Sequence, residues 1–273
     1  MPELPEVETI KRQLNKKIKD KKIKSVRINL AKFLKTNKKT FKKAVEGTKI
    51  KGVKRRAKLL IIELDNDYAL VVHLKMTGQL IYPDGEITKH THLIYTFSDN
   101  SQLLHNDMRQ FGWVKLLKKE DLKKYLEEKE AYGPEPLAKD FTLKLFKDLL
   151  KKKSQAQIKP LLMNQQFVAG IGNVYSDEIL FYVQVKPTRK VKDLTQKEIE
   201  KIFKGIKEIL PQAISKRGTS SDNYVDTNGK EGRFVPFLKV YQRAGQSCLR
   251  CGAEIERQKI GGRSAHFCPK CQK

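Results

Sequence analysis

Hydrophobic residues near the N-terminus recur at helical spacing. Val7, Ile10, Leu14 and Ile18 follow one another at intervals of three or four residues. Such intervals place the four side chains on one face of an α-helix, where they can be buried together. We therefore expect a helix that begins just after Pro5 and packs this face against a core.

Between residues 23 and 117 the pattern changes to short hydrophobic runs separated by turn-forming residues. LLIIEL (59–64) and YALVVHL (68–74) flank Asp65-Asn66-Asp67, which predicts a β-hairpin. Further strand-like runs lie at 92–97, 101–105 and 113–117. Strands at this density, without helices between them, predict a β-sandwich or barrel.

After residue 117 the periodicity becomes helical. The segment 121–132 ends at Gly133-Pro134-Glu135-Pro136, a stiff connector that indicates a domain boundary. The polar, glycine-containing stretch 217–233 is expected to be a loop. Helices are expected near 142–152, 155–165, 173–183 and 195–216. The expected organisation is a β-sandwich domain (1–130), a linker (131–141), a helical domain (142–240) and a C-terminal hairpin module (241–273).

The size and charge of the chain extend this picture. At 273 residues with 39% hydrophobic residues, the chain can form two domains with separate cores. Lys and Arg number 57 against 31 Asp and Glu, a net charge of +26. Such an excess favours a polyanionic partner, DNA or RNA, although a lysine-rich composition of the source organism would also contribute to it.

No hydrophobic run exceeds strand length, and the N-terminus lacks the pattern of a secretory signal. We therefore expect a cytoplasmic protein that does not associate with membranes, and we expect a monomer.

All four cysteines lie near the C-terminus in two CxxC pairs. Cys248 and Cys251 form the first pair, Cys268 and Cys271 the second, with sixteen residues between the pairs. This spacing favours one tetrahedral Zn²⁺, whose closed shell of four thiolates makes the metal structural. The alternative is two disulfides, which are rare in cytoplasmic proteins.

The N-terminus offers a nucleophile. Removal of Met1 before the small residue Pro2 leaves a secondary amine, which can attack an electrophilic sugar carbon and form an iminium ion. Glu3 and Glu6 follow closely and can move protons beside that amine. Taken alone this signal is weak, because proline is an ordinary second residue in many proteins.

Several motifs, in order along the whole chain, resemble those of the formamidopyrimidine-DNA glycosylase family. The matching segments are PELPEVET (2–9), RRAK (55–58), HLKMTGQL (73–80), DMRQFG (107–112), GPEPL (133–137), IKPLLMNQQFVAGIGNVYSDEILF (158–181), VYQRAGQSC (240–248) and GGRSAHFCPKCQ (261–272). The resemblance implies an α+β fold, in which an N-terminal β-sandwich with a catalytic N-terminal helix is hinged to a helix–two-turns–helix domain that carries a zinc β-hairpin.

The resemblance also implies roles for catalytic residues. Pro2 matches the nucleophile of the family, and Glu3 matches the acid that protonates the departing base or the sugar oxygen. Glu6 is expected to position the site, although it is equally an ordinary carboxylate of a first helical turn. Lys58 matches a lysine that serves β-elimination, and Arg263 matches a phosphate clamp that takes part in δ-elimination.

A second group of residues matches DNA contacts of the family. His73, Met76, Arg109 and Phe111 correspond to side chains that contact the opposite strand and fill the void left by an extruded nucleotide. An apolar side chain beside a planar cation suits such a void. Without the resemblance, core packing is the simpler interpretation of Met76 and Phe111. His90 also corresponds to a DNA contact.

In the helical domain, Gly170-Ile171-Gly172 precedes a helix that is expected to start near Asn173. Free backbone amides at such a helix end can bind a phosphate. The resemblance implies that Lys159 and Asn173 hold the phosphates that flank the lesion. It also implies that the loop 217–233 closes over the extruded base, although disorder is consistent with its composition.

The chain departs from the usual family pattern at three positions. Lys75 stands where glycine is usual, Gln110 where a second arginine is common, and Ala265 where threonine is common. We expect Lys75 to perturb the turn that presents Met76.

The resemblance implies a bifunctional glycosylase/AP lyase that removes 8-oxoguanine and formamidopyrimidines from duplex DNA. The reaction passes through a Schiff base on Pro2, followed by β,δ-elimination. Its partner is double-stranded DNA that contains oxidised bases or abasic sites. Two alternatives stay open: an endonuclease VIII-type enzyme for oxidised pyrimidines, and a non-catalytic, zinc-containing nucleic-acid-binding protein. The PELPEVET start and the long loop before the zinc hairpin favour the purine enzyme.

Overall fold

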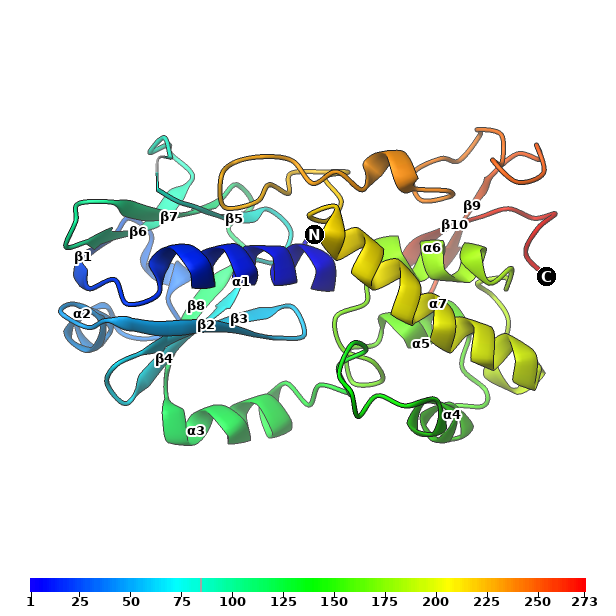
Figure 1. The fold of residues 1–273 in the computed structure, drawn as a ribbon, viewed down its shortest axis with the longest axis horizontal. Helices are drawn as coiled ribbons and strands as arrows, with labels where there is room; N and C mark the ends of the chain where they lie inside the picture. The colour runs from blue at the N-terminus through cyan, green and yellow to red at the C-terminus, as the bar shows by residue number, and fades with distance from the viewer. Residues whose placement is uncertain (84) are drawn as a thin grey trace. The chain divides into compact units, whose positions relative to one another are not determined.

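The structure is a computed structural model that describes residues 1–83 and 85–273 (Figure 1). The chain divides into two compact units. The first unit comprises residues 1–130 and 214–235, and the second comprises 131–213 and 236–273. The sequence predicts a helical domain over residues 142–240; of these, residues 214–235 cluster with the unit that contains the N-terminus.

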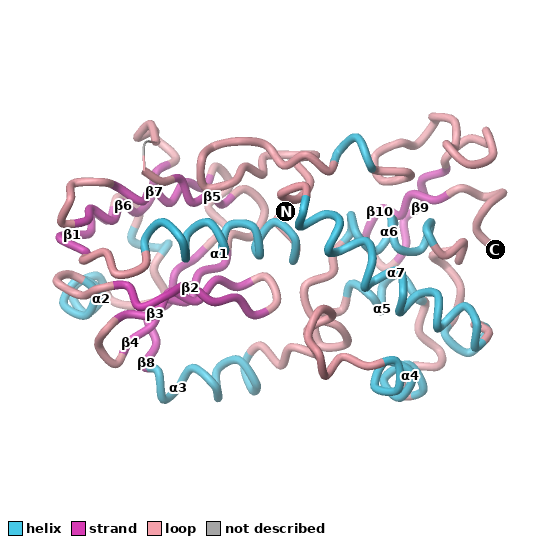
Figure 2. The backbone as a smooth tube through the Cα atoms, in the orientation of Figure 1, coloured by secondary structure: helices cyan, strands magenta, loops and turns pink. Residues whose placement is uncertain are grey.

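The first unit contains the expected β-sandwich, built from two antiparallel four-stranded sheets (Figure 2). One sheet has the order β1 (Ile23–Ile28), β6 (Thr91–Phe97), β7 (Gln102–Asp107), β5 (Gly78–Ile81). The other has the order β2 (Ile50–Arg56), β3 (Leu59–Leu64), β4 (Tyr68–His73), β8 (Trp113–Lys118). The predicted hairpin is confirmed, since β3 and β4 pair antiparallel with Leu59 opposite His73.

Helix α1 (Leu4–Ile18) supplies one side of the core of this unit. The four periodic side chains, Val7, Ile10, Leu14 and Ile18, are all buried, as the pattern predicted. The helix begins at Leu4 rather than after Pro5, because Glu3 and Glu6 form a capping box that starts it earlier. Asn15 Oδ1 accepts a hydrogen bond from Val53 N at 2.8 Å and ties the helix to β2.

Short helices complete the first unit. They are η1 (Ala31–Phe33), α2 (Lys38–Val45), α3 (Lys119–Lys124) and the π-helical turn η2 (Tyr125–Lys129). Helix α2 lies beside β1, an edge strand, and Glu46 Oε1 accepts the hydrogen bond of Val26 N at 2.8 Å. Covering an edge in this way prevents further strands from pairing with it.

The second unit is helical and ends in a β-hairpin. Its helices are α4 (Leu143–Lys151), α5 (Ile158–Met163), α6 (Asn173–Tyr182), η3 (Val191–Asp193), α7 (Gln196–Ser215, whose last two residues belong to the first unit) and η4 (Val235–Phe237, whose first residue belongs to the first unit). Its hairpin consists of the paired strands β9 (Glu256–Ile260) and β10 (Arg263–Phe267). Phe141, Phe146 and Phe167 are buried in its core, where the Phe146 ring contacts the other two, and the half-buried Phe203 lies against Phe141. Among the helices described, none has the length and hydrophobicity needed to span a membrane.

Candidate functional site

The first two residues lie at the start of α1. Pro2 and Glu3 are buried, and the amine of Met1 lies 3.7 Å from Asp222 Oδ2. As long as Met1 is attached, the nitrogen of Pro2 is an amide and is not nucleophilic. The secondary amine of Pro2 therefore exists only after Met1 is removed.

The capping box fixes both carboxylates behind Pro2. Glu6 Oε2 accepts a hydrogen bond from Glu3 N at 2.7 Å, and Glu6 Oε1 accepts one from Thr219 N at 2.8 Å. Both glutamates are 2% exposed. Gly218 has φ +81°, and a Cβ at this position would lie 2.5 Å from Glu6 Oε1. Glu6 therefore ties the segment after α7 to the start of α1, which supports the positioning role expected for it.

Lys58 lies in the two-residue connection between β2 and β3 and is 6% exposed. The same connection is attached to α1, because Arg55 Nε donates to Glu8 Oε2 at 3.0 Å and Arg55 Nη1 donates to Ala57 O. Burial alone would raise the pKa of Glu8, but hydrogen bonds from Arg12 and Arg55 outweigh it and lower this pKa. The RRAK motif thus holds Lys58 in place through a partly buried ion pair with the N-terminal helix.

His73 is held in one neutral form. Burial, with smaller contributions from the charges of Lys75 and Lys58, lowers the pKa of His73 to about 3. The backbone N–H of Lys75 donates to His73 Nδ1 at 2.9 Å. Since Nδ1 accepts this bond, the proton of the neutral ring is on Nε2. His73 can therefore donate a hydrogen bond to an anion without carrying charge.

Met76, Arg109 and Phe111 come together at the surface of the first unit. Arg109 Cζ lies 4.8 Å from the centre of the Phe111 ring, and Arg109 Nη1 lies 3.7 Å from Met76 Sδ. Phe111 is 55% exposed, so the core-packing interpretation of this residue is wrong. An exposed aromatic ring against a guanidinium group is suited to stacking on bases.

Asp107 holds the turn that presents these side chains. This buried carboxylate accepts hydrogen bonds from Thr77 Oγ1 and from the backbone N–H groups of Arg109 and Gly112. Its own N–H donates to His90 O at 2.9 Å, which places the predicted contact His90 beside the same turn. Sequence reasoning missed Asp107, although it opens the DMRQFG motif.

The second unit brings Asn173 and Arg263 into one pocket. A cavity of about 410 Å³ is lined by Asn173 at the start of α6, Arg263 on β10, and further residues of the hairpin and the preceding segment, namely Tyr241, Gln242, Arg257, Gly262, Ser264 and His266. Gly172 is the N-cap of α6, whose first amides lie at this end of the helix. Polar donors and two arginines make the pocket suitable for an anion.

Lys159 is not placed as expected. Its side chain is fully buried, and Nζ donates to Asp177 Oδ1 at 2.5 Å and to Ser264 O at 2.9 Å. It therefore lies behind the pocket wall rather than in the pocket. A direct contact of Lys159 with phosphate, as the motif implied, does not follow from this geometry, because its ammonium group is already engaged.

The four cysteines converge as predicted. All four Sγ atoms lie within 4.8 Å of one another, and the Cys248–Cys271 and Cys251–Cys268 sulfur distances are 3.9 and 3.5 Å. Tetrahedral Zn²⁺ with Zn–S bonds of about 2.3 Å requires sulfur separations of about 3.8 Å. These distances fit one zinc ion and are far too long for disulfide bonds.

The loop 217–233 is docked on α1 rather than extended into solvent. Gln13 Nε2 donates to Asp226 Oδ2 at 3.0 Å, and Gln13 Oε1 accepts a hydrogen bond from Thr227 N at 2.9 Å. Tyr224 is 5% exposed and donates from its hydroxyl to Arg217 O at 3.0 Å. The composition of this segment did not reveal these buried anchors.

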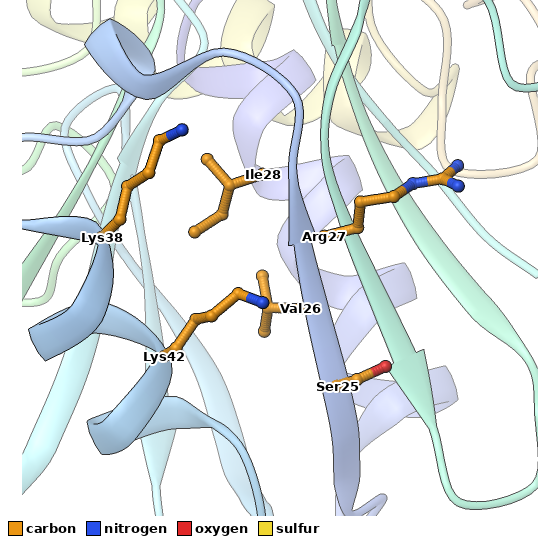
Figure 3. Close-up of a pocket in the computed structure, with 6 residues that line it drawn as sticks. All are labelled: Ser25, Val26, Arg27, Ile28, Lys38 and Lys42. Atoms are coloured by element: carbon orange, nitrogen blue, oxygen red, sulfur yellow. The ribbon is translucent and has the colours of Figure 1, made fainter.

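A second hollow, of about 460 Å³, contains none of the expected site residues. It lies between β1 and α2 and is lined by Ser25, Val26, Arg27, Ile28, Lys38 and Lys42. In Figure 3, Lys38 and Lys42 extend from α2 towards β1, whereas Arg27 and Ser25 point to the other side of the strand. We interpret this hollow as the space between the edge strand β1 and the basic helix α2 that covers it.

Comparisons with known proteins agree along the whole chain. Three family models match successive segments: the Formamidopyrimidine-DNA glycosylase N-terminal domain (1–114), the Formamidopyrimidine-DNA glycosylase H2TH domain (132–224), and the Zinc finger found in FPG and IleRS (245–273). A formamidopyrimidine-DNA glycosylase of Pelotomaculum thermopropionicum is 42% identical over 276 residues, which covers 100% of this chain and 99% of that protein.

Two solved structures of Lactococcus lactis Fpg, each 39% identical, have the same fold. Its complex with DNA that contains an abasic site superimposes with a TM-score of 0.92 and 99% coverage of both chains. Its complex with DNA that contains an oxidised pyrimidine superimposes with a TM-score of 0.91 and 100% coverage of both chains.

Proposed function

The chain belongs to the formamidopyrimidine-DNA glycosylase family, and from this membership we propose how its own residues carry out the reaction. It is a bifunctional DNA glycosylase and AP lyase that acts on formamidopyrimidines and abasic sites. It binds DNA that contains damaged bases or abasic sites, and its hairpin holds a structural zinc ion. We propose oxidised purines, including 8-oxoguanine, as its main substrates, and a cytoplasmic monomer without membrane association as the working form.

The nucleophile of this proposal is the amine of Pro2 after removal of Met1. Its nitrogen forms a bond to C1′ while the glycosidic bond breaks, and the base leaves with the bonding electrons and a proton from Glu3. After this attack the nitrogen of Pro2 still carries one proton. Transfer of that proton to O4′ by way of the Glu3 carboxylate breaks the C1′–O4′ bond, opens the sugar ring and gives an iminium ion between Pro2 and C1′. The observation that carries the proposal is the capping box directly behind Pro2, where Glu3 and Glu6 are almost completely buried.

The iminium ion then promotes cleavage of the backbone. It acidifies the C2′ proton, whose removal expels the 3′ phosphate, and a second elimination expels the 5′ phosphate. Lys58 serves the first elimination, and Arg263 holds phosphate during the second. The partly buried ion pair of Arg55 with Glu8 supports the role of Lys58, because it fixes the turn that carries this lysine beside α1.

DNA is held by two groups of residues in this proposal. Arg109, Phe111 and Met76 fill the void that the extruded nucleotide leaves, with His73 and His90 nearby as backbone contacts. Asn173 and Arg263 bind phosphate in the pocket of the second unit. The exposure of Phe111 and the shared pocket of Asn173 and Arg263 support these assignments.

Borohydride trapping tests the nucleophile. We expect protein with a processed N-terminus to form a covalent adduct with an oxidised duplex in the presence of borohydride, and Pro2→Gly to lose most base excision while still binding DNA. Acetylation of the terminal amine should have the same effect as Pro2→Gly. Turnover at an undiminished rate with a blocked amine would contradict the proposal.

Substrate choice needs a separate comparison, because the related Lactococcus lactis enzyme has been solved with an oxidised pyrimidine. Single-turnover rates on duplexes with 8-oxoguanine opposite cytosine and with thymine glycol should favour 8-oxoguanine. A preference for thymine glycol would assign the enzyme to oxidised pyrimidines. Release of no free base from either duplex would contradict 8-oxoguanine as a main substrate.

A further inference from the structure

A buried charge cluster lies behind the phosphate pocket of the second unit. Asp177, Lys159 and His266 are 1%, 0% and 6% exposed. They come from three neighbouring elements, since Lys159 is on α5, Asp177 on α6 and His266 on β10 (Figure 1). The proposed reaction leaves Asp177 and His266 without a role.

Asp177 is the centre of this cluster. Its Oδ1 accepts a hydrogen bond from Lys159 Nζ at 2.5 Å, and its Oδ2 accepts hydrogen bonds from N and Nδ1 of His266, both at 3.0 Å. Lys159 Nζ also donates to Ser264 O at 2.9 Å. The Asp177 carboxylate thus links α6 directly to β10 at His266. It also links α6 to Lys159 of α5, which in turn binds β10 at Ser264 O.

The cluster borders the pocket, because His266 lines it and Asp177 lies one helical turn from the lining residue Asn173. Asn173, which lines the pocket, and Asp177 are four residues apart on α6 and therefore share a face of the helix. On β10, Ser264 and His266 line the pocket together with Arg263. A displacement of β10 relative to α6 would therefore change the distance between Asn173 and Arg263.

The segment that leads into the hairpin is fixed to the same helix. Glu178 accepts hydrogen bonds from the backbone N–H groups of Lys239, Val240 and Tyr241 at 2.8, 3.0 and 2.9 Å. The Tyr241 ring meets the His266 ring edge-on, with 5.1 Å between their centres. The adjacent acids Asp177 and Glu178 therefore position two contacting parts of the pocket wall, at His266 and at Tyr241, from one turn of α6.

Burial restricts the conformations available to the cluster of Asp177, Lys159 and His266. The Lys159–Asp177 ion pair has no access to solvent, and removal of one partner would leave an uncompensated charge in a dry environment. The hydrogen bonds of such a cluster have few alternative geometries in which every group is satisfied. The cluster is therefore suited to holding surface groups at a fixed spacing.

We propose that Asp177 is a positioning residue for DNA binding, which holds β10 against α6 so that Arg263 and Asn173 face the same phosphate. The inference rests on the proposed function of this pocket as a phosphate site. It gives Lys159 an indirect role, in which the lysine acts on DNA through Asp177 and Ser264.

Asp177→Asn tests the proposal, since asparagine keeps the shape of the side chain and removes its charge. Binding is measured on a duplex with a tetrahydrofuran abasic analogue, and the active fraction is counted by borohydride trapping on an abasic duplex. We expect the Kd of the active fraction to rise about tenfold. The rate of Schiff-base formation at saturating enzyme should not change, because the reacting residues Pro2 and Glu3 are untouched.

Glu198→Gln is the matched control. Glu198 is also an acid of the second unit, and it accepts hydrogen bonds from Thr195 N and from Arg189, but it does not line the pocket. Its substitution should leave the Kd unchanged. A purely structural role of Asp177 would lower the active fraction and leave the Kd of that fraction at the wild-type value, which would overturn the proposal.

A double-mutant cycle with Arg263→Gln tests whether Asp177 acts through the pocket. In the Arg263→Gln background, Asp177→Asn should change the Kd less than about twofold, whereas fully multiplicative effects would overturn the proposal. If Arg263→Gln alone left the Kd unchanged, the phosphate assignment of the proposed function would fail instead.

If Asp177→Asn does not fold, the double variant Asp177→Leu/Lys159→Met replaces it, because this variant removes both buried charges together. Weak DNA binding by the folded double variant supports the proposal, and wild-type binding overturns it.

Discussion

At the scale of single residues, two of the positions that depart from the family pattern have a left-handed backbone conformation. Lys75 and Gln110 adopt φ values of +51° and +57°, the left-handed region in which a side chain costs roughly 1 kcal/mol or more. Lys75 was expected to perturb its turn. This stays a prediction; in the turn as it stands, the N–H of Lys75 donates to His73 Nδ1.

From the sequence, the role of a residue could be predicted where its partners are close along the chain or where its motif has a specific spacing. The four cysteines were found because each CxxC pair brings its ligands together locally. The burial of Lys159 could not be found in this way, because its partners Asp177 and Ser264 are 18 and 105 residues away. Asp107 could not be found for a different reason, because the DMRQFG motif indicates the residues that contact DNA and not the carboxylate that holds their turn.

His105 gives a prediction at this scale. It is fully buried beside Phe33, and its ring nitrogens have no hydrogen-bond partner among residues 1–83 and 85–273. Burial lowers the pKa of His105 to about 3, partly opposed by the charge of Asp107. Because the unfolded chain binds this proton near pH 6.5 and the folded chain near pH 3, His105 destabilises the fold as the pH falls through this window.

We therefore expect His105→Leu to raise the free energy of unfolding at pH 7 by about 1 kcal/mol, because an unsatisfied polar group is removed. Between pH 7 and pH 5, the variant should lose roughly 2 kcal/mol less stability than the wild type. Urea unfolding at the two pH values measures both effects. Equal losses in the two proteins would contradict this explanation.

At the scale of elements, the hydrophobic periodicity predicted those helices and strands whose form depends on residues close together in the chain. The hydrophobic stripe of α1 and the β3–β4 hairpin were both correct. The helix expected at 155–165 is shorter, Ile158–Met163, and the one expected at 121–132 becomes α3 followed by a π-helical turn. The docking of the 217–233 loop on α1 could not be predicted, because Gln13 and Asp226 are 213 residues apart.

Gly218→Ala tests the contact between this loop and α1. A Cβ at Gly218 would lie 2.5 Å from Glu6 Oε1, so alanine must displace the Glu6 carboxylate, disrupting its bonds to Thr219 N and Glu3 N. We expect the variant to lose about tenfold in single-turnover base excision, since a charge-assisted hydrogen bond contributes roughly 1.5–3 kcal/mol.

The loop provides its own control. Gly229 also has a left-handed φ, +72°, but a Cβ there would meet nothing within 4 Å. Gly229→Ala should therefore show the cost of backbone strain without the effect on excision. An equal loss of excision in both variants would mean that strain, rather than Glu6, is responsible.

At the scale of the whole molecule, the net charge of +26 predicts strong dependence of DNA binding on salt. Each phosphate contact contributes about −0.9 to the slope of log K against log salt concentration. Arg263→Gln should reduce the size of this slope by about one, because one phosphate contact is lost. Binding isotherms at salt concentrations from about 50 to about 300 mM would measure the slope for both proteins. An unchanged slope in Arg263→Gln would contradict a phosphate contact of Arg263.

The first unit is assembled from two stretches of chain, residues 1–130 and 214–235, with most of the second unit encoded between them. During synthesis, α1 therefore leaves the ribosome long before the strip that carries Thr219, Tyr224 and Asp226 exists to cover it. An N-terminal fragment that stops at Glu130 would expose that side of α1 to solvent and to proteases. Conversely, a single protease cut after Glu130 would leave both parts of the first unit intact, with the second of them still covalently attached to the helical unit.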